Sequence, residues 1–242
     1  MLHIENLCVV RGEGKQSHRV CLPQLSLRPG EVMAVTGESG CGKSTLLEAI
    51  GLLLRPASVG RFTLETETLL DVGILLTHNQ QPELADIRAR HLGFVLQNGG
   101  LLPFLNVQDN ITLPCQLLGK QPDRAMLKRV SDTLKLGPLL SKLPAQLSFG
   151  ERQRTAFARA ILHRPGLVLA DEPTAALDPH NAQQLFRLFI DLVAQESMMA
   201  LVVCHDWPLV NRFKLPCLVA RTGSDTSDLS EDQAKRGTHF VL

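Results

Sequence analysis

The chain has 242 residues, 44% of them hydrophobic, which is long and apolar enough to bury a sizeable core. Its 25 basic residues nearly balance its 24 acidic ones, so bulk charge gives no support for a nucleic-acid partner, although a local basic patch stays open. No apolar run approaches the length of a membrane span, and the N-terminus lacks the pattern of a signal peptide.

The cysteines show no C-x-x-C pairing, and several lie inside apolar runs, where a reduced thiol packs as a small hydrophobic group. We therefore predict reduced thiols and a cytoplasmic location. The six positions are Cys8, Cys21, Cys41, Cys115, Cys204 and Cys217.

The first part of the chain, residues 2–36, predicts an antiparallel sheet. Short apolar or alternating segments cover 7–10, 20–22, 25–27 and 32–36, and glycine and proline turns separate them. The last of these segments is β-branched and leads into a glycine-rich stretch.

That stretch, GESGCGKS, fits the phosphate-loop pattern G-x-x-x-x-G-K-S/T between a predicted strand and a predicted helix. Its glycines let the backbone N–H groups face inward, and the positive end of the following helix favours a polyphosphate at the same place. Lys43 would reach the β and γ phosphates, and the hydroxyl of Ser44 would bind Mg²⁺. The alternative is a glycine-rich turn without a ligand. The candidate nucleotide-binding residues are Gly37, Glu38, Ser39, Gly40, Cys41, Gly42, Lys43, Ser44 and Thr45.

After the loop helix, residues 61–70 alternate like a half-exposed strand, 78–90 suit a helix, and 91–96 read as a buried strand that ends at Gln97. Residues 98–145 contain prolines and short amphipathic stretches, including a predicted helix over 123–136, and indicate a small helical subdomain.

The last part returns to alternating helices and apolar strands. A helix opens at 147–151 and runs through 160, a strand covers 167–170, a helix covers 179–195, and a strand covers 200–203. This alternation predicts a mostly parallel sheet with helices on both faces. A polar tail over 222–236 is too short for another domain.

Polar residues follow the buried strands at their carboxyl ends, where ligands of such sheets bind. Asp171 and Glu172 end one strand; the first carboxylate would hold Mg²⁺, and the second would orient or deprotonate the attacking water. Gln97 and His205 each follow another strand in the same way, so we expect all of them to line one sheet edge. Taken singly, each of these is more often a turn residue.

Two predicted helix starts have both a structural and a functional interpretation. Ser148 and Glu151 fit a capping box, and the same start with Gly150 beside it is also an anion site. Asp178 before Pro179 is typical of an N-cap followed by proline at the first helical position.

Together the ordered motifs GESGCGKS, Gln97, LSFGERQ, LVLADE, ALD and His205 resemble the nucleotide-binding cassette of an ABC (ATP-binding cassette) transporter over nearly the whole chain. The resemblance implies an α/β fold with a P-loop NTPase (RecA-like) core, an N-terminal antiparallel β subdomain and an inserted α-helical subdomain. Residues 1–242 would form one cassette, with 1–97 and 154–242 as the core and 98–153 as the helical signature subdomain.

By the same resemblance, the protein is an ATPase that uses ATP and Mg²⁺. Glu172 would be the catalytic base, His205 would contact the γ-phosphate, and Gln97 would touch Mg²⁺ or the attacking water, while Ser44 and Asp171 bind the metal. Ser148, Gly150 and Asp178 would reach the ATP of a second copy, in a head-to-tail homodimer around two nucleotides.

The stretch LLPFLNVQDNITLP is similar to the lipoprotein-releasing and macrolide-exporter group (LolD and MacB types), and cell-division cassettes of the FtsE type look alike here. The implied partner is an integral membrane permease, with the cassette peripheral to the cytoplasmic face of the inner membrane. There are two alternatives, and the single loop motif and the lack of a heptad run in this chain speak against the second of them. One is a regulatory, FtsE-like ATPase that signals without transport, and the other is a soluble ABC ATPase of DNA repair or translation, which usually has two cassettes or a coiled-coil insertion.

Three positions depart from the family pattern. Phe149 replaces the first glycine of the signature, and Glu151 replaces the usual glutamine. The chain has no tyrosine, and Arg11 stands where the family stacks an aromatic ring on adenine. A guanidinium can stack on a base, or Arg11 can be a solvated turn residue.

An apolar group around Pro103 follows Gln97 directly and consists of Leu101, Leu102, Phe104 and Leu105. Each residue could pack internally or form an exposed interface. Because a nucleotide contact at Gln97 can move a membrane partner only through a segment that touches it, we expect at least one of them to be exposed.

Overall fold

The computed structural model describes residues 1–12, 17–175, 177–222 and 237–242. Contacts divide the chain into two compact units, and each is described by itself. The first unit is Met1–Arg28, Val32–Asp86 and Val203–Leu242, and the second is Pro29–Glu31 and Ile87–Val202. From residue 223 to its end, the predicted polar tail lies outside the described residues, and the helical subdomain over 98–153 stays a prediction.

The first unit is built on a sheet with the strand order β5-β4-β1-β2-β10-β9-β3. β1 pairs antiparallel with both β2 and β4, whereas β3 pairs parallel with β9. The bounds are β1 Leu2–Arg11, β2 His18–Leu27, β3 Val32–Thr36, β4 Arg61–Glu65, β5 Leu69–Asp71, β9 Cys217–Thr222 and β10 Gly237–Val241. The helices of this unit are α1 Lys43–Ile50, α2 Val72–Thr77 and α8 Trp207–Arg212, and α3 Gln81–His91 crosses into the second unit.

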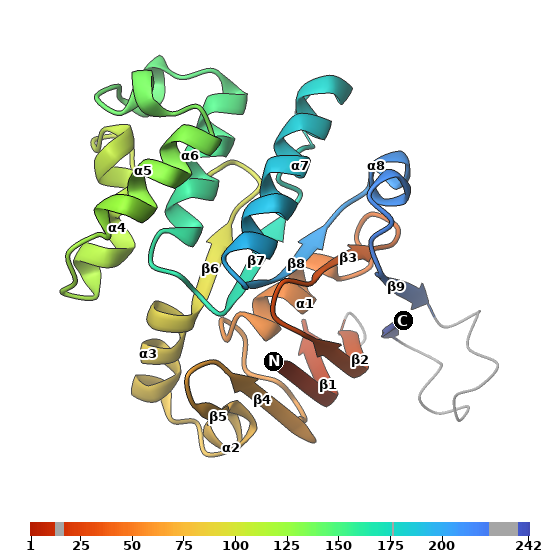
Figure 1. Ribbon diagram of the computed structural model, residues 1–242. Helices are drawn as coiled ribbons and strands as arrows, with labels where there is room; N and C mark the ends of the chain where they lie inside the picture. Colours follow the sequence, from red (N-terminus) through yellow and green to blue (C-terminus); the bar gives the residue numbers. More distant parts are fainter. Residues whose placement is uncertain (13–16, 176, 223–236) are drawn as a thin grey trace. The chain divides into compact units, whose positions relative to one another are not determined.

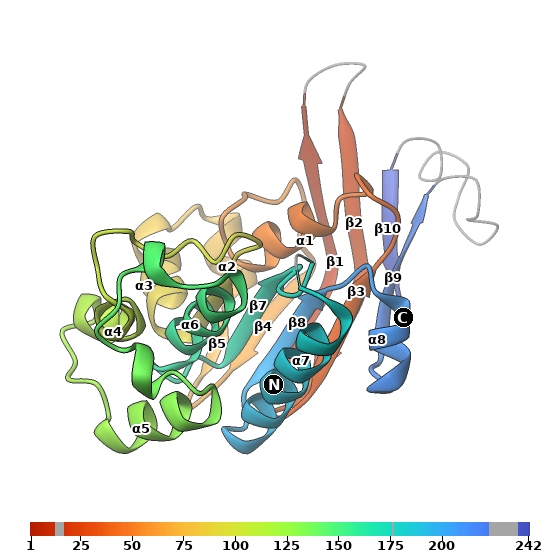
Figure 2. The same ribbon diagram turned by 90° about the horizontal axis from the view of Figure 1, so that it is seen from above.

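The N-terminal antiparallel pairing was predicted, but its strands are longer than the sequence segments. The segments at 7–10, 20–22 and 25–27 belong to the long strands β1 and β2 (Figure 2), whose register runs from Leu2 opposite Leu27 to Arg11 opposite His18. Cross-strand pairing thus overrides the polar interruptions. The strand expected over 61–70 is the hairpin β4 and β5, and α2, which ends before the helix predicted over 78–90, was missed.

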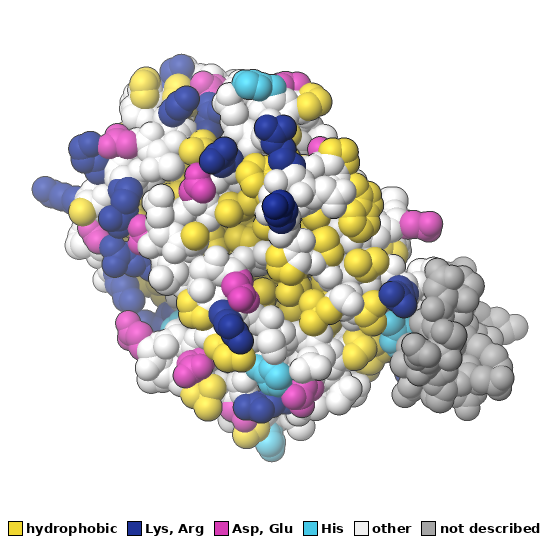
Figure 3. Space-filling view, turned by 45° about the vertical axis from the view of Figure 1, so that its right-hand side comes forward, with side chains coloured by type: hydrophobic (Ala, Val, Ile, Leu, Met, Phe, Trp, Pro, Cys, Tyr) yellow, Lys and Arg dark blue, Asp and Glu magenta, His cyan; other side chains and the backbone are white. Residues whose placement is uncertain are grey.

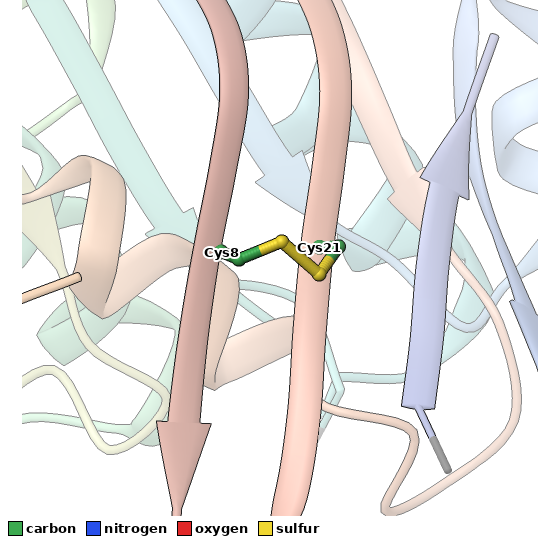
Figure 4. The surroundings of a disulfide bond; sticks show 2 residues. All are labelled: Cys8 and Cys21. Carbon is green, nitrogen blue, oxygen red and sulfur yellow. A yellow bond between two sulfur atoms is a disulfide. The ribbon is translucent and has the colours of Figure 1, made fainter. Parts of the chain in front are cut away.

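The expectation that all six thiols are reduced was wrong for one pair. Cys8 of β1 and Cys21 of β2 form a disulfide (Figure 4), because the register places them directly opposite each other with a Cα–Cα distance of 4.2 Å. The local sequence shows two separate apolar runs and does not reveal this register. Cys41, Cys115, Cys204 and Cys217 are free thiols.

The second unit contains strands in the order β8-β7-β6, and β6 and β7 pair in parallel from Leu92 opposite Leu167 to Val95 opposite Ala170. The strand bounds are β6 Leu92–Val95, β7 Leu167–Asp171 and β8 Met199–Val203, the last residue of which belongs to the first unit. The helices are α4 Val107–Leu117, α5 Arg124–Thr133, α6 Phe149–Ile161 and α7 Pro179–Gln195, with 3-10 turns η2 Gly137–Leu139 and η3 Pro144–Gln146. Within this unit, α4 packs against α6 (Figure 1).

β6 and α6 approach each other unusually closely at Gly93. A Cβ atom at this position would lie 2.2 Å from the carbonyl oxygen of Ala160, which no side chain tolerates. The strand that leads to Gln97 is therefore packed directly against the backbone of α6.

In the part of the chain that the structure describes, every helix is too short or too polar to cross a membrane.

Candidate active site

The predicted phosphate loop connects β3, which is buried along its whole length, to α1, which begins at Lys43. Gly42 has a φ of 99°, and a Cβ atom there would lie 2.5 Å from Cγ2 of Val20. Gly37 has a φ of 150°, and a Cβ atom there would lie 2.5 Å from Cβ of Ala220. Both positions therefore require glycine, because the backbone there lies against the side chains of Val20 and Ala220.

Lys43 is buried, with 5% of its surface exposed, and its ammonium group is held by the loop. It donates hydrogen bonds to the carbonyl oxygens of Gly37 at 3.0 Å and Glu38 at 2.6 Å. Ser44 is exposed beside it, whereas Thr45 is buried. Glu38, Ser39 and Gly40 are exposed, and Cys41 is buried.

His205 lies at the same end of the sheet as the phosphate loop. The N–H of the preceding residue, Cys204, donates to the carbonyl oxygen of Val35 in β3 at 3.1 Å. His205 therefore lies close to the end of β3, where the phosphate loop begins. Its side chain is exposed. The first unit thus brings together two predicted parts of the site.

Arg11 ends β1, and its guanidinium donates to the carboxylate of Glu48 in α1. This ion pair ties the end of β1 to the helix that follows the phosphate loop. About half of the Arg11 side chain, 52%, stays exposed. Sequence reasoning missed Glu48, because nothing in the local pattern links residues so far apart.

The second unit contains the predicted carboxylates and Gln97. The parallel register of β6 and β7 places Gln97 and Glu172 at the same strand ends, and Nε2 of Gln97 donates to Oε2 of Glu172 at 3.1 Å. Glu172 has a φ of 47°, a backbone conformation that costs energy for a residue with a side chain and that clusters at functional sites. Asp171 is the last residue of β7. The expectation that these strand-end residues meet is confirmed for Gln97 and Glu172.

Both predicted helix caps are present. Oγ of Ser148 accepts from the N–H of Glu151 at 3.3 Å, and the Glu151 carboxylate accepts from the N–H of Ser148 at 2.7 Å, an arrangement that lowers the pKa of Glu151. Gly150 lies in the first turn of α6, and the guanidinium of Arg152 lies 5.7 Å from the ring centre of Phe149.

Asp178 caps α7 by accepting from the N–H of Asn181 at 3.1 Å, and this hydrogen bond lowers the pKa of Asp178. Its other carboxylate oxygen accepts from the side-chain amide of Asn181 at 2.6 Å. Asp178 is exposed, so its carboxylate stays charged at the surface at neutral pH.

Two residues that sequence reasoning missed, Gln153 and Arg159, connect α6 to the backbone at residues 97–100. A signal was present in the sequence: Gln153 and Arg159 lie on the helix face that also carries Ala156 and Ala160, where a polar side chain is uncommon unless it is paired.

The donor atoms fit ATP and Mg²⁺. In the first unit, the backbone N–H groups of the glycine-rich loop and the buried ammonium of Lys43 suit phosphate, and the hydroxyl of Ser44 is an oxygen donor of the kind that Mg²⁺ prefers. In the second unit, the carboxylate of Asp171 and the amide oxygen of Gln97 are donors of the same kind. Glu172, held by an amide, suits the orientation of a water molecule.

Comparison with known proteins agrees with this chemistry. A family model described as ABC transporter matches residues 23–175. The chain is 41% identical over 192 residues to the lipoprotein-releasing system ATP-binding protein LolD of Pseudomonas fluorescens, covering 78% of this chain and 81% of the relative. It is 39% identical over 191 residues to LolD of Colwellia psychrerythraea, covering 78% of this chain and 71% of the relative.

Among solved structures, the chain is similar to the ATP-binding cassette MJ0796 in a dimeric post-hydrolysis state bound to ADP and Pi. The TM-score is 0.74 at 28% identity, with 90% of this chain and 94% of the other covered. The chain thus has a phosphate loop, strand-end carboxylates and the signature helix, which is α6 with its cap at Ser148. Its relatives and its fold both indicate the same family. The protein belongs to the ABC transporter family and is an ATP-binding, ATP-hydrolysing cassette of that family.

Proposed function

We propose that this cassette powers a separate membrane permease of the lipoprotein-release or macrolide-export type, from the cytoplasmic face of the inner membrane. Its similarity to the LolD proteins of lipoprotein-releasing systems supports this subfamily. The observation that carries the proposal is the exposure of Phe104, a large apolar residue close after Gln97, with 74% of its surface accessible.

In the proposed cycle, Lys43 and the phosphate-loop N–H groups would bind the phosphates of ATP. Ser44, Asp171 and Gln97 would hold Mg²⁺, which would supply positive charge to neutralise the phosphates. Glu172 deprotonates or orients the attacking water, and its hydrogen bond to Gln97 fixes the carboxylate for that task. His205 contacts the γ-phosphate. Its place beyond Cys204, at the loop end of β3, supports this role.

We further propose a head-to-tail homodimer, supported by the dimeric form of the similar cassette structure. Ser148 and Gly150 at the start of α6 and Asp178 at the start of α7 would reach the nucleotide of the second copy. All three lie at helix N-termini, where N–H groups and the helix dipole favour anions.

The permease would dock on the second unit. Leu101, Leu102 and Leu105 are half-buried, whereas Phe104 protrudes, which confirms the expectation that at least one residue of this group is exposed. The same unit has a pocket of about 270 Å³ between α3, β6, α4 and α6, lined by leucines of α4 and by Arg88, Arg159 and His163. Figure 3 shows that hydrophobic side chains are also exposed elsewhere on the molecule.

Co-purification tests this function. The wild-type cassette, expressed with the membrane proteins of its source, should retain an integral membrane permease, and Phe104→Glu should lose it while still folding and binding ATP. Leu69→Glu is a matched control, because Leu69 is 65% exposed but lies in β5 of the first unit.

Retention of the permease by Phe104→Glu would place the docking surface elsewhere. If the wild-type cassette retains no membrane protein, the permease assignment is wrong.

A further inference from the structure

α6 holds the backbone of residues 97–100 through side chains on one helix face. Nε2 of Gln153 donates to the carbonyl oxygen of Gln97 at 2.5 Å. The guanidinium of Arg159 donates to the carbonyl oxygens of Gly99 at 2.9 Å and Gly100 at 2.8 Å. Positions 153, 156 and 159 are three apart and therefore share a face of the helix. The middle residue, Ala156, also lies close to this turn, because a Cβ atom at Gly99 would be 3.6 Å from the Cβ of Ala156.

Gln153 is expected to lower the stability of the fold at this position. Only 1% of its surface is exposed, and its Oε1 atom has no hydrogen-bond partner among the described residues. Since a buried, half-satisfied amide costs stability relative to an apolar side chain of the same size, packing alone does not account for a glutamine here. The contact that it does make, with the carbonyl of Gln97, is the feature that an apolar side chain cannot supply.

The backbone that Gln153 holds carries the side chain that contacts Glu172. Nε2 of Gln97 donates to Oε2 of Glu172 at 3.1 Å, so two hydrogen bonds lead from α6 through Gln97 to the proposed base. α6 itself begins at the capping box of Ser148 and Glu151. A displacement of the signature helix would therefore also displace the amide that orients Glu172.

We propose that Gln153 is a positioning residue of the ATPase reaction, which fixes the backbone at Gln97 so that the Gln97 amide orients Glu172; this role rests on the proposed role of Glu172 as base. Arg159, about one and two-thirds helical turns further along α6, supports the same turn. The pair makes α6 and residues 97–100 move as one body. The geometry of Glu172 thereby depends on the position of the signature helix.

A double-mutant cycle separates positioning from general support of the fold. Gln153→Met keeps the length of the side chain but removes the donor, and it should lower kcat about tenfold or more with the Kd for ATP unchanged within about twofold. In a Gln97→Met background, Gln153→Met should have no further effect on kcat, because the amide through which it acts is gone. Gln195→Met, at the exposed end of α7, is the control and should match the wild type.

An equal loss of kcat in both backgrounds would overturn the proposal. Normal turnover of Gln153→Met beside an inactive Glu172→Gln would overturn the role of Gln153 alone. Normal turnover of Glu172→Gln would instead show that the assignment of the base is wrong.

A second readout does not depend on activity. Hydrogen exchange at residues 97–100 of the nucleotide-free protein should become faster in Gln153→Met and in Arg159→Lys. Unchanged exchange in both variants would show that these side chains do not stabilise the turn. If Gln153→Met does not fold, Arg159→Lys carries the test and should show the same selective loss of kcat.

Discussion

The ammonium nitrogen of Lys43 lies 2.6 Å from the carbonyl oxygen of Glu38, so the phosphate loop binds its own lysine. Among the residues that the structure describes, no carboxylate pairs with this buried ammonium group, so none competes there with phosphate. A phosphate oxygen is a stronger acceptor than a carbonyl oxygen, because it carries charge. The lysine is thus ready to exchange a backbone contact for a nucleotide.

Replacing Lys43 with alanine should weaken ATP binding itself. Hydrogen bonds to charged groups are worth about 1.5–3 kcal/mol, which corresponds to about a ten- to hundredfold rise in Kd. Titration with a fluorescent ATP analogue measures the Kd of the variant. Lys120→Ala, which changes an exposed lysine, is the control. Unchanged affinity in Lys43→Ala would remove this residue from the site.

Glu172→Gln should bind ATP normally but lose turnover by about a hundredfold or more, since the amide keeps the shape and hydrogen bonding of the carboxylate but cannot accept a proton. The stalled protein should accumulate as an ATP-bound dimer in size-exclusion chromatography. Steady-state ATPase assays measure the first effect. A variant that hydrolyses at the wild-type rate would show that another group is the base.

Base discrimination should be poor, because the resemblance to the family assigns Arg11 to the position where an aromatic ring stacks on adenine. The Arg11 side chain is half exposed and bound to Glu48. GTP should compete with ATP within about threefold in affinity. Competition binding decides this. A strong preference for ATP would mean that another residue supplies the platform for the base.

Acid should destabilise the second unit through His163. Burial lowers the pKa of this imidazole below its ordinary value of 6.5, and Lys120 and His91 lower it further, although a hydrogen bond to the Leu92 carbonyl at 3.1 Å opposes the shift. The unfolded chain therefore binds more protons, so the contribution is fully present above pH 6.5 and is lost as the pH falls through the folded pKa. Urea unfolding at pH 7.5 and 5.5 should show a smaller loss for His163→Gln than for the wild type; equal losses would contradict this.

Reduction of the Cys8–Cys21 disulfide should lower the free energy of unfolding. The two residues are 13 apart in sequence, and a bridge closing a loop of this size stabilises a protein by about 3 kcal/mol. Urea unfolding with and without a thiol reductant measures the effect, and Cys8→Ser should no longer respond. If the reductant leaves the urea midpoint of the wild type unchanged, the bridge is absent or does not stabilise the protein.

Local features of this molecule could be predicted from the sequence. The strand before Gly37, the helix after it and the caps at Ser148 and Asp178 depend on neighbours within a few residues, and the structure contains all of them. The meeting of Gln97 and Glu172 was also predictable, because parallel strands end at one edge.

Contacts set by register and packing could not be predicted. The disulfide depends on how β1 slides along β2, and Gln153 meets Gln97 across 56 residues of chain through the seating of α6 on β6. The ion pair of Arg11 with Glu48 likewise requires the three-dimensional fold. Helix α2 was missed because its six residues are too few to show a helical period.

The close approach at Gly93 limits which sequences laboratory evolution can reach. Where Ala160 comes within 2.2 Å of the absent side chain, even alanine would force strand and helix apart. In a library that randomises residues 92–95, the functional variants should therefore have varied aliphatic residues at positions 92, 94 and 95 and only glycine at position 93. A designer who wishes to retune the cassette must leave that one position untouched and diversify around it.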